Sequence, residues 1–288
     1  MKKLLFFLAV ILLLGVFGYS GWQLYAYYSA GAETQDTYNQ LLALKEQVPA
    51  ETAPDIPVET APDIPPEDTP LPQTPARPRI PAGTVSVTHP ETGQIHHVLP
   101  EFQELWLLNP DLVGWISIEG TKIDYPVVQS AVNQADYYLK RDFYGKRASR
   151  GCIYAREQCD ILKPSDNITI YGHRMNDYTM FGDLGKFKRQ SFWEDHRYVR
   201  FDSLWERGTY EIIAVFQTQA AGDDYFPYHT FVDAADEGEF DAFWARCKEL
   251  ALFDTGLEAR FGDKLITLST CDYHEENGRL VVVAKRIN

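Results

Sequence analysis

The chain has 288 residues, 45% of them apolar, and a formal net charge of −14 at pH 7. This length and apolar content are enough for one globular domain with appended segments. The acidic balance argues against general binding to nucleic acid or to an anionic membrane surface. Much of the acidic excess, however, lies between Glu33 and Asp68, where nine acids accompany a single base, Lys45.

Residues 1–30 predict a membrane anchor. Two lysines precede an uncharged stretch from Leu4 to Tyr19, and apolar and aromatic residues continue to the Tyr27-Tyr28 pair. About 20 apolar residues span a hydrocarbon core as a helix, and Trp and Tyr collect at its edges. The lysines place the amino terminus in the cytoplasm and the rest of the chain outside the cell. Cleavage of a signal peptide after Ala30-Gly31-Ala32 is the alternative, but the length of the apolar stretch favours a retained anchor.

Residues 31–84 predict an acidic, proline-rich linker. A short helix is expected over residues 33–48, followed by a proline-rich tract at 49–81 in which Glu51-Thr-Ala-Pro-Asp-Ile-Pro57 recurs as Glu59-Thr-Ala-Pro-Asp-Ile-Pro65. A segment this rich in proline and acid forms an extended, self-repelling spacer. At roughly 3 Å per residue, about 33 residues reach on the order of 100 Å. The tract is therefore interpreted as a stalk, with recognition by proline-binding modules as the alternative.

Residues 85–288 predict a globular domain made mainly of β-strands. A short helix is expected at 102–112, further helices near 181–188 and 237–250, and strands at 113–118, 123–128, 151–155, 167–171, 210–216, 265–270 and 280–284. Many short strands with few helices favour a closed β-barrel with flanking helices. In the last helix Phe240, Phe243, Trp244 and Cys247 follow helical spacing, so Cys247 is expected in the core.

The last two strands predict a hairpin with a reactive group on each side. Cys271 ends the strand Leu265–Thr270, and Arg279 begins the next strand after the turn signal Asn277-Gly278. Pairing of these strands makes Cys271 and Arg279 cross-strand neighbours. A fixed positive charge beside a thiol favours the thiolate and stabilises a developing oxyanion. The hairpin therefore indicates a candidate catalytic site.

Two histidines are candidate partners for this thiol. His173 follows the strand at 167–171, at a position where a rigid strand end holds a functional loop. His274 lies three residues after Cys271 and is the rival. Cys152 and Cys159 are a possible disulfide pair, and their spacing has no zinc-site character. No metal-binding or phosphate-loop motif is present in the sequence.

Several separate motifs resemble the sortases, the cysteine transpeptidases of Gram-positive bacteria. They are Asn167-Ile-Thr-Ile-Tyr-Gly-His173, Thr179-Met-Phe-Gly-Asp-Leu184, Thr267-Leu-Ser-Thr-Cys271 and Arg279-Leu-Val-Val-Val-Ala-Lys285. Val113-Gly-Trp-Ile, Ile123-Asp-Tyr-Pro-Val-Val-Gln129, Tyr137-Tyr-Leu-Lys-Arg-Asp-Phe143 and the helix at 237–250 resemble the class B branch. The resemblance covers residues 100–288 and implies an eight-stranded sortase-type β-barrel, preceded here by the anchor and the stalk.

The resemblance also implies roles for individual residues. Cys271 corresponds to the nucleophile, His173 to the general acid/base, and Arg279 to the residue that steadies substrate and oxyanion. The substrate groove maps onto Leu139, Tyr225, Phe226, Ser269 and Asp272. Of these, Ser269 has independent support, because period-two alternation puts it on the same strand face as Cys271. These roles require no metal and no organic cofactor.

The implied reaction is sorting at the outer face of the membrane. The enzyme cleaves a C-terminal sorting motif of secreted surface proteins after Thr, through a thioacyl intermediate, and transfers the acyl group to a peptidoglycan amine. A pilin lysine is the alternative acceptor, and a non-catalytic wall-tethered binding module is the alternative from another class. The expected location is a single-pass protein of the cell membrane with an extracellular catalytic domain, and no nucleic acid partner is expected.

Overall fold

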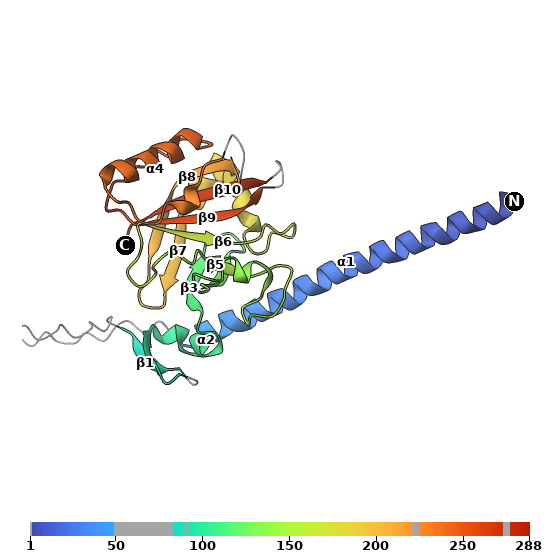
Figure 1. Cartoon of the computed structure of the whole chain (residues 1–288), viewed down its shortest axis with the longest axis horizontal. Helices are drawn as coiled ribbons and strands as arrows, with labels where there is room; N and C mark the ends of the chain where they lie inside the picture. The colour runs from blue at the N-terminus through green and yellow to red at the C-terminus, as the bar shows by residue number, and fades with distance from the viewer. Residues whose placement is uncertain (1, 49–82, 90–91, 221–224, 273–276) are drawn as a thin grey trace, which may run out of the picture.

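A computed structural model describes residues 2–48, 83–89, 92–220, 225–272 and 277–288. The proline-rich tract at 49–81, including its tandem repeat, and His274 lie outside these residues. Figure 1 shows a β-barrel from which one long helix projects.

Eight strands close the barrel, in the order β10-β8-β7-β3-β4-β5-β6-β9. Within the described residues only the β4–β5 and β6–β9 pairs are parallel. The expected eight-stranded barrel is confirmed. The barrel strands are β3 (Leu112–Ser117), β4 (Asp124–Val128), β5 (Ile153–Ala155), β6 (Asn167–Tyr171), β7 (Tyr198–Ser203), β8 (Thr209–Gln219), β9 (Leu265–Asp272) and β10 (Gly278–Arg286).

Three strands were not expected from the sequence. β7 alternates exposed and buried side chains only over its first half, so its periodic signal is short. β1 (Val85–Thr88) and β2 (Ile95–Val98) form a separate two-stranded sheet before the barrel. These two strands are only four residues long, which leaves little pattern to detect.

The short helices connect strands around the barrel. The segment expected as one helix at 102–112 divides into η1 (Pro100–Phe102) and α2 (Gln103–Leu108), and β3 begins before residue 113. The segment near 181–188 is a 3₁₀-helix, η3 (Gly182–Lys188), rather than an α-helix. The remaining short helices are η2 (Tyr137–Lys140), α3 (Gln190–Asp195) and η4 (Tyr228–Thr230).

Helix α4 (Glu237–Leu250) has the expected bounds and covers one side of the barrel. The carboxylate of Asp236 caps it by accepting a hydrogen bond from the Glu239 amide. Cys247 is buried in the core beneath it, as expected. Cys152 and Cys159 are also buried, and both are free thiols in the structure.

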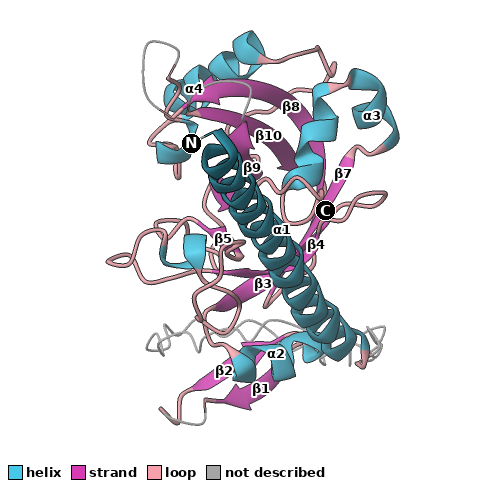
Figure 2. Cartoon of the chain, turned by 90° about the vertical axis from the view of Figure 1, so that its right-hand side faces the viewer, coloured by secondary structure: helices cyan, strands magenta, loops and turns pink. Residues whose placement is uncertain are grey.

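Helix α1 (Lys2–Glu46) is one continuous helix and is the one described helix long and apolar enough to cross a membrane. The expected division at residue 30 therefore falls inside it. Figure 2 views the barrel with α1 running towards the reader. The carboxyl-terminal part of α1 packs on the barrel: Leu41 is fully buried, the Tyr38 hydroxyl donates to the Gly151 carbonyl at 3.2 Å, and the Lys45 ammonium lies 4.7 Å from the Trp115 ring centre. Hence α1 itself, rather than the length of the stalk, sets the distance from the apolar segment to the barrel.

Candidate active site

Parallel pairing of β6 and β9 brings together two segments that lie about a hundred residues apart. Tyr171 of β6 is in register with Ser269 of β9. Two residues further along each strand are His173 and Cys271, so the register places them at the same level at one end of the barrel. The Thr270 hydroxyl donates to the Gly172 carbonyl at 2.7 Å and fixes this end of the pair. A Cβ atom at residue 172 would overlap Ile153 and Phe181, so glycine permits the close approach.

The β9–β10 hairpin supplies the third group. Arg279 is directly opposite Cys271 in the antiparallel register, which confirms the neighbourhood expected from the sequence. Asn277 enters the second strand with a positive φ of 58°, a conformation that asparagine adopts more readily than most residues. The Arg279 guanidinium donates to the carbonyls of Asn277 and Gly278 at 3.3 and 3.0 Å. These hydrogen bonds hold the guanidinium beside the Cys271 thiol, and both acceptors are backbone carbonyls rather than carboxylates.

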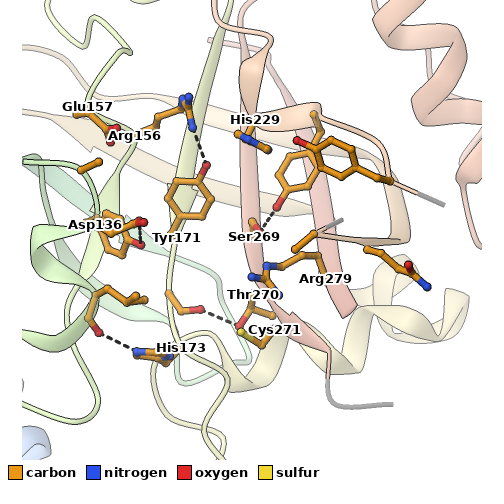
Figure 3. Close-up of a pocket in the computed structure, with 18 residues that line it drawn as sticks. Asp136, Arg156, Glu157, Tyr171, His173, His229, Ser269, Thr270, Cys271 and Arg279 are labelled. Carbon is orange, nitrogen blue, oxygen red and sulfur yellow. Dashed lines mark hydrogen bonds between the residues drawn. The ribbon is translucent and has the colours of Figure 1, made fainter. Parts of the chain in front are cut away.

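A cavity of about 440 Å³ opens over these three residues (Figure 3). Its lining combines charged and aromatic side chains from several elements, a composition that suits a binding site. Cys271, His173 and Arg279 are each half-buried, so the reacting groups remain accessible. The other lining residues are Ala135, Asp136, Leu139, Tyr154, Arg156, Glu157, Tyr171, Gly172, Gln219, Ala220, Tyr225, Tyr228, His229, Ser269 and Thr270.

The orientation of His173 follows from one backbone contact. Its Nε2 atom lies 2.7 Å from the Leu139 carbonyl oxygen. A carbonyl only accepts, so Nε2 carries the proton of this hydrogen bond. In the neutral ring Nδ1 then holds the free lone pair and is the atom available to accept a proton.

A buried hydroxyl pair forms the floor of the cavity beside the thiol. The Tyr228 and Ser269 hydroxyls are 2.6 Å apart, and both residues are almost fully buried. Burial raises the pKa of Tyr228, so it stays a neutral phenol. Burial, followed by the positive charges of Arg156 and Arg279, lowers the pKa of the nearby His229. This histidine therefore gains a proton at a lower pH than a typical histidine does.

The five expected substrate residues divide into two groups. Leu139, Tyr225 and Ser269 line the cavity. Phe226 does not: its ring packs against Phe216 and Phe243, with centroids 5.8 Å away in each case, as part of the core under α4. Asp272 does not line the cavity either, because period-two alternation turns it to the opposite face of β9 from Cys271.

Asp272 is instead the centre of a buried ionic cluster behind the site. It is 2% exposed and accepts from Arg174 at 2.9 Å, from Gln217 at 2.5 Å and from Lys188. Arg174 directly follows His173, and Asp272 directly follows Cys271. The Arg174–Asp272 ion pair therefore ties the two chain segments that carry His173 and Cys271.

Removing this carboxylate is expected to destabilise the domain. Asp272→Ala leaves two cations, each about a fifth exposed, without their shared partner. Loss of one member of a buried ion pair costs about 3–5 kcal/mol, and the partial hydration of the cations brings the expected cost to about 2–3 kcal/mol. Chemical denaturation of the full chain measures this difference.

The matched control is an exposed ion pair on α4. Glu249→Ala removes the ion pair between Arg246, which is 39% exposed, and Glu249, which is 68% exposed. The loss of this exposed pair should cost under about 1 kcal/mol of stability. An equal loss of unfolding free energy in the two variants would show that the ion pairs of Asp272 do not stabilise the domain more than an exposed pair does.

Sequence reasoning missed Tyr228, His229 and Arg156 as residues of the site. Tyr228 and His229 come soon after the expected Tyr225, but nothing in their local pattern distinguishes them from core or surface residues. Arg156 follows β5, and only the pairing of β5 with β6 brings it to the cavity, where it contacts the Tyr171 hydroxyl at 3.5 Å. Their place at the cavity depends on how the barrel strands pair, and the local sequence pattern does not give that pairing.

A thiol, an imidazole and a guanidinium at one end of a closed eight-stranded barrel define a cysteine-dependent acyl-transfer site. The model of the sortase domain matches residues 116–287, and the chain belongs to the sortase family. It is 32% identical over 193 residues to sortase B of Staphylococcus aureus and 34% identical over 194 residues to sortase B of Listeria monocytogenes. Each match covers 66% of this chain, with 76% of the first relative and 75% of the second.

Solved structures agree with this placement. The Staphylococcus aureus sortase B–substrate complex superposes with a TM-score of 0.60 at 31% identity, covering 67% of this chain and 87% of that one. Bacillus anthracis sortase B in complex with AAEK1 gives a TM-score of 0.59 at 33% identity, covering 71% of this chain and 90% of that one. The chain is thus a class B sortase, a cysteine transpeptidase.

Proposed function

We propose that this sortase cleaves a C-terminal sorting motif of secreted surface proteins after a Thr residue and transfers the acyl group to an amine of cell-wall peptidoglycan. The observation that carries the proposal is the juxtaposition of Cys271 with Arg279 in one hairpin, at the level of His173 on the neighbouring strand. The roles that follow were expected from the family resemblance and are supported by this placement.

The first half-reaction forms the thioester. The Cys271 thiolate attacks the Thr carbonyl carbon, a C–S bond forms, and the carbonyl π electrons move to oxygen. Arg279 stabilises this oxyanion from the opposite strand. Collapse breaks the C–N bond, and Nδ1 of the His173 imidazolium gives its proton to the leaving amine while Nε2–H stays on the Leu139 carbonyl.

The second half-reaction reverses these roles. The acceptor amine attacks the thioester carbonyl and gives its extra proton to neutral His173 at Nδ1. The C–S bond then breaks, and Cys271 leaves as a thiolate beside the restored imidazolium. The cycle ends with the protonation states in which it began.

The proposed location is the outer face of the cell membrane. The apolar part of α1 is exposed along its length, and Lys2 and Lys3 precede it, which supports a single-pass anchor with a cytoplasmic amino terminus. Retention of this anchor is supported by a contact before the possible cleavage site, because the Arg150 guanidinium of the catalytic domain lies 5.1 Å from the Tyr27 ring centre.

A peptide-transfer experiment tests the proposal. The full chain in detergent is incubated with a library of sorting-motif peptides and either a glycine-bearing muropeptide or a lysine-bearing pilin fragment, and the products are read by mass spectrometry. We expect cleavage after Thr and transfer to the muropeptide amine. Preferential transfer to the pilin lysine would establish the alternative acceptor, and absence of any cleavage would refute the proposal.

Arg279 gives a sharper prediction within the same assay. Arg279→Ala should lower kcat/KM about 10²–10³-fold, as loss of an oxyanion-stabilising donor does. Arg279→Lys keeps the charge but loses the planar fork that is held by the Asn277 and Gly278 carbonyls, so it should recover only part of the rate. Full activity in the lysine variant would show that charge alone matters. Full activity in the alanine variant would remove Arg279 from the mechanism.

A further inference from the structure

The packing of α1 determines how the catalytic domain is oriented. Apolar and aromatic residues of α1 are exposed as far as Tyr28, which marks the expected boundary of the hydrocarbon core. The barrel begins to contact the helix at this same level. The Arg150 guanidinium lies 5.1 Å from the Tyr27 ring centre, and a Cβ atom at residue 31 would overlap that guanidinium. The catalytic domain therefore sits directly against the plane in which the helix leaves the bilayer.

The active-site end of the barrel faces this plane. In Figure 1 the carboxyl ends of β6 and β9, which lead to His173 and Cys271, point to the side on which the amino-terminal half of α1 projects. The opposite end of the barrel and α4 lie on the far side. The end of the barrel that carries His173 and Cys271 thus lies on the side of the proposed membrane.

An exposed tyrosine lies at the same level as Tyr27. Arg150, which contacts Tyr27, also binds Asp177 at 2.7 Å and Thr179 at 2.8 Å. Tyr178 lies between these two anchored residues, is 55% exposed, and has a positive φ of 64°. A bulky residue adopts this conformation only where the surrounding contacts impose it, and such strain accompanies functional segments. The loop therefore holds an aromatic ring outward at the depth where aromatic side chains meet lipid headgroups.

A basic segment lies beside this loop. Residues 140–150 contain five bases and one acid in a chain whose net charge is −14, and four of these bases precede Arg150, which is buried and ion-paired with Asp177. The acid, Asp142, uses its carboxylate to accept the backbone amides of Tyr144 and Lys146. The segment ends at Arg150, against Tyr27 and Gly31, and is followed by Gly151, which is bonded to Tyr38. Its carboxyl-terminal end therefore meets α1 just outside the boundary, and Lys146 lies 5.9 Å from the exposed Tyr144 ring.

We propose that the Tyr178 loop and the basic segment at 140–150 form a membrane-contact surface that binds anionic phospholipid headgroups and fixes the height of the catalytic groove above the bilayer. The net negative charge of the whole chain does not prevent this contact. At moderate salt, charges more than about 10 Å apart are largely screened, so the headgroups interact mainly with the bases nearest to them. Lys122 and Lys186 border the same surface: the first donates to the Asp177 carbonyl at 2.9 Å, and the second is ion-paired with Asp183 at 2.8 Å and lies 5.6 Å from the Tyr178 ring.

Lipid photo-cross-linking tests this contact. The inference rests on the proposed membrane anchor, so the full chain is placed in nanodiscs of phosphatidylglycerol or of phosphatidylcholine. Tyr178→p-benzoylphenylalanine is compared with the same change at Tyr198, which is 52% exposed and pairs with Glu211, towards the end of the barrel away from the active site. We expect lipid adducts at position 178 in phosphatidylglycerol discs, fewer in phosphatidylcholine discs, and none above background at 198. Equal yields at the two positions would overturn the proposal.

Charge reversal separates the headgroup contact from mere proximity. Lys146→Glu with Arg147→Glu should lower the adduct yield at position 178 by at least about fivefold. Lys163→Glu with Arg260→Glu, which changes the net charge equally on exposed residues outside this surface, should leave it unchanged. Equal effects of the two pairs would overturn the proposal. Failure of the chain to enter the discs would refute the anchor and the contact together, whereas loss of peptide transfer with normal adducts would refute only the proposed function.

Discussion

Replacing Cys271 with alanine should abolish transpeptidation while leaving the fold intact. Without the thiolate no thioacyl intermediate can form, and loss of a catalytic nucleophile lowers kcat by at least about 10³-fold. Cys271 is half-exposed at the end of β9, so its truncation opens no core cavity. Peptide transfer and thermal unfolding of the same sample measure the two effects separately.

Cys247 provides the opposite control. Its thiol is fully buried under α4, so Cys247→Ala should cost about 1–2 kcal/mol of stability through lost packing and retain transfer activity. Activity that survives in Cys271→Ala, or is lost to the same degree in both variants, would contradict the assignment of the nucleophile.

His173→Ala should lower kcat/KM by about 10²–10⁴-fold, the usual contribution of general acid–base catalysis. The leaving amine would depart without a proton donor, and the acceptor amine would attack without a base. The pH–rate profile gives a second measurement, because the variant should lose the ionisation that the imidazole contributes to the wild-type profile. A thioester trapped by hydroxylamine would report the acylation step on its own.

Two other histidines make this test specific. The His196 ring also makes a hydrogen bond to a backbone carbonyl, that of Phe192 at 2.9 Å, but His196 does not line the cavity. The His196→Ala variant should therefore keep the pH–rate profile of the wild-type enzyme. His274, the rival from the sequence, lies outside the described residues, and His274→Ala should retain activity. An activity loss in His274→Ala without one in His173→Ala would reverse the assignment of the base.

Local sequence pattern predicted one half of the site and not the other. The Cys271–Arg279 pair follows from a strand, a turn signal and a second strand, all within twenty-two residues. His173 joins them through the parallel β6–β9 pair, whose partners are 98 residues apart in the chain. No local spacing encodes such a contact, and only the family resemblance supplied it.

The misplaced substrate residues have a similar explanation. Phe226 follows Tyr225 directly, but the Phe226 amide donates to the Thr218 hydroxyl and its ring packs into the core under α4. Asp272 is adjacent to the nucleophile in sequence and on the opposite face of the strand. The resemblance points to both segments, whereas the direction of each side chain depends on packing that the sequence does not state.

The packing of α1 on η1 and α2 has a consequence for how the chain can vary. The 34 residues from 49 to 82 connect the region after α1 to the region before β1, so they close a loop between two described parts of the chain. The entropy of loop closure depends only on the logarithm of loop length. Deleting one eight-residue repeat should thus change stability by only about 0.2 kcal/mol. Copies of the repeat can be lost or duplicated by genetic slippage while the catalytic groove stays where it is.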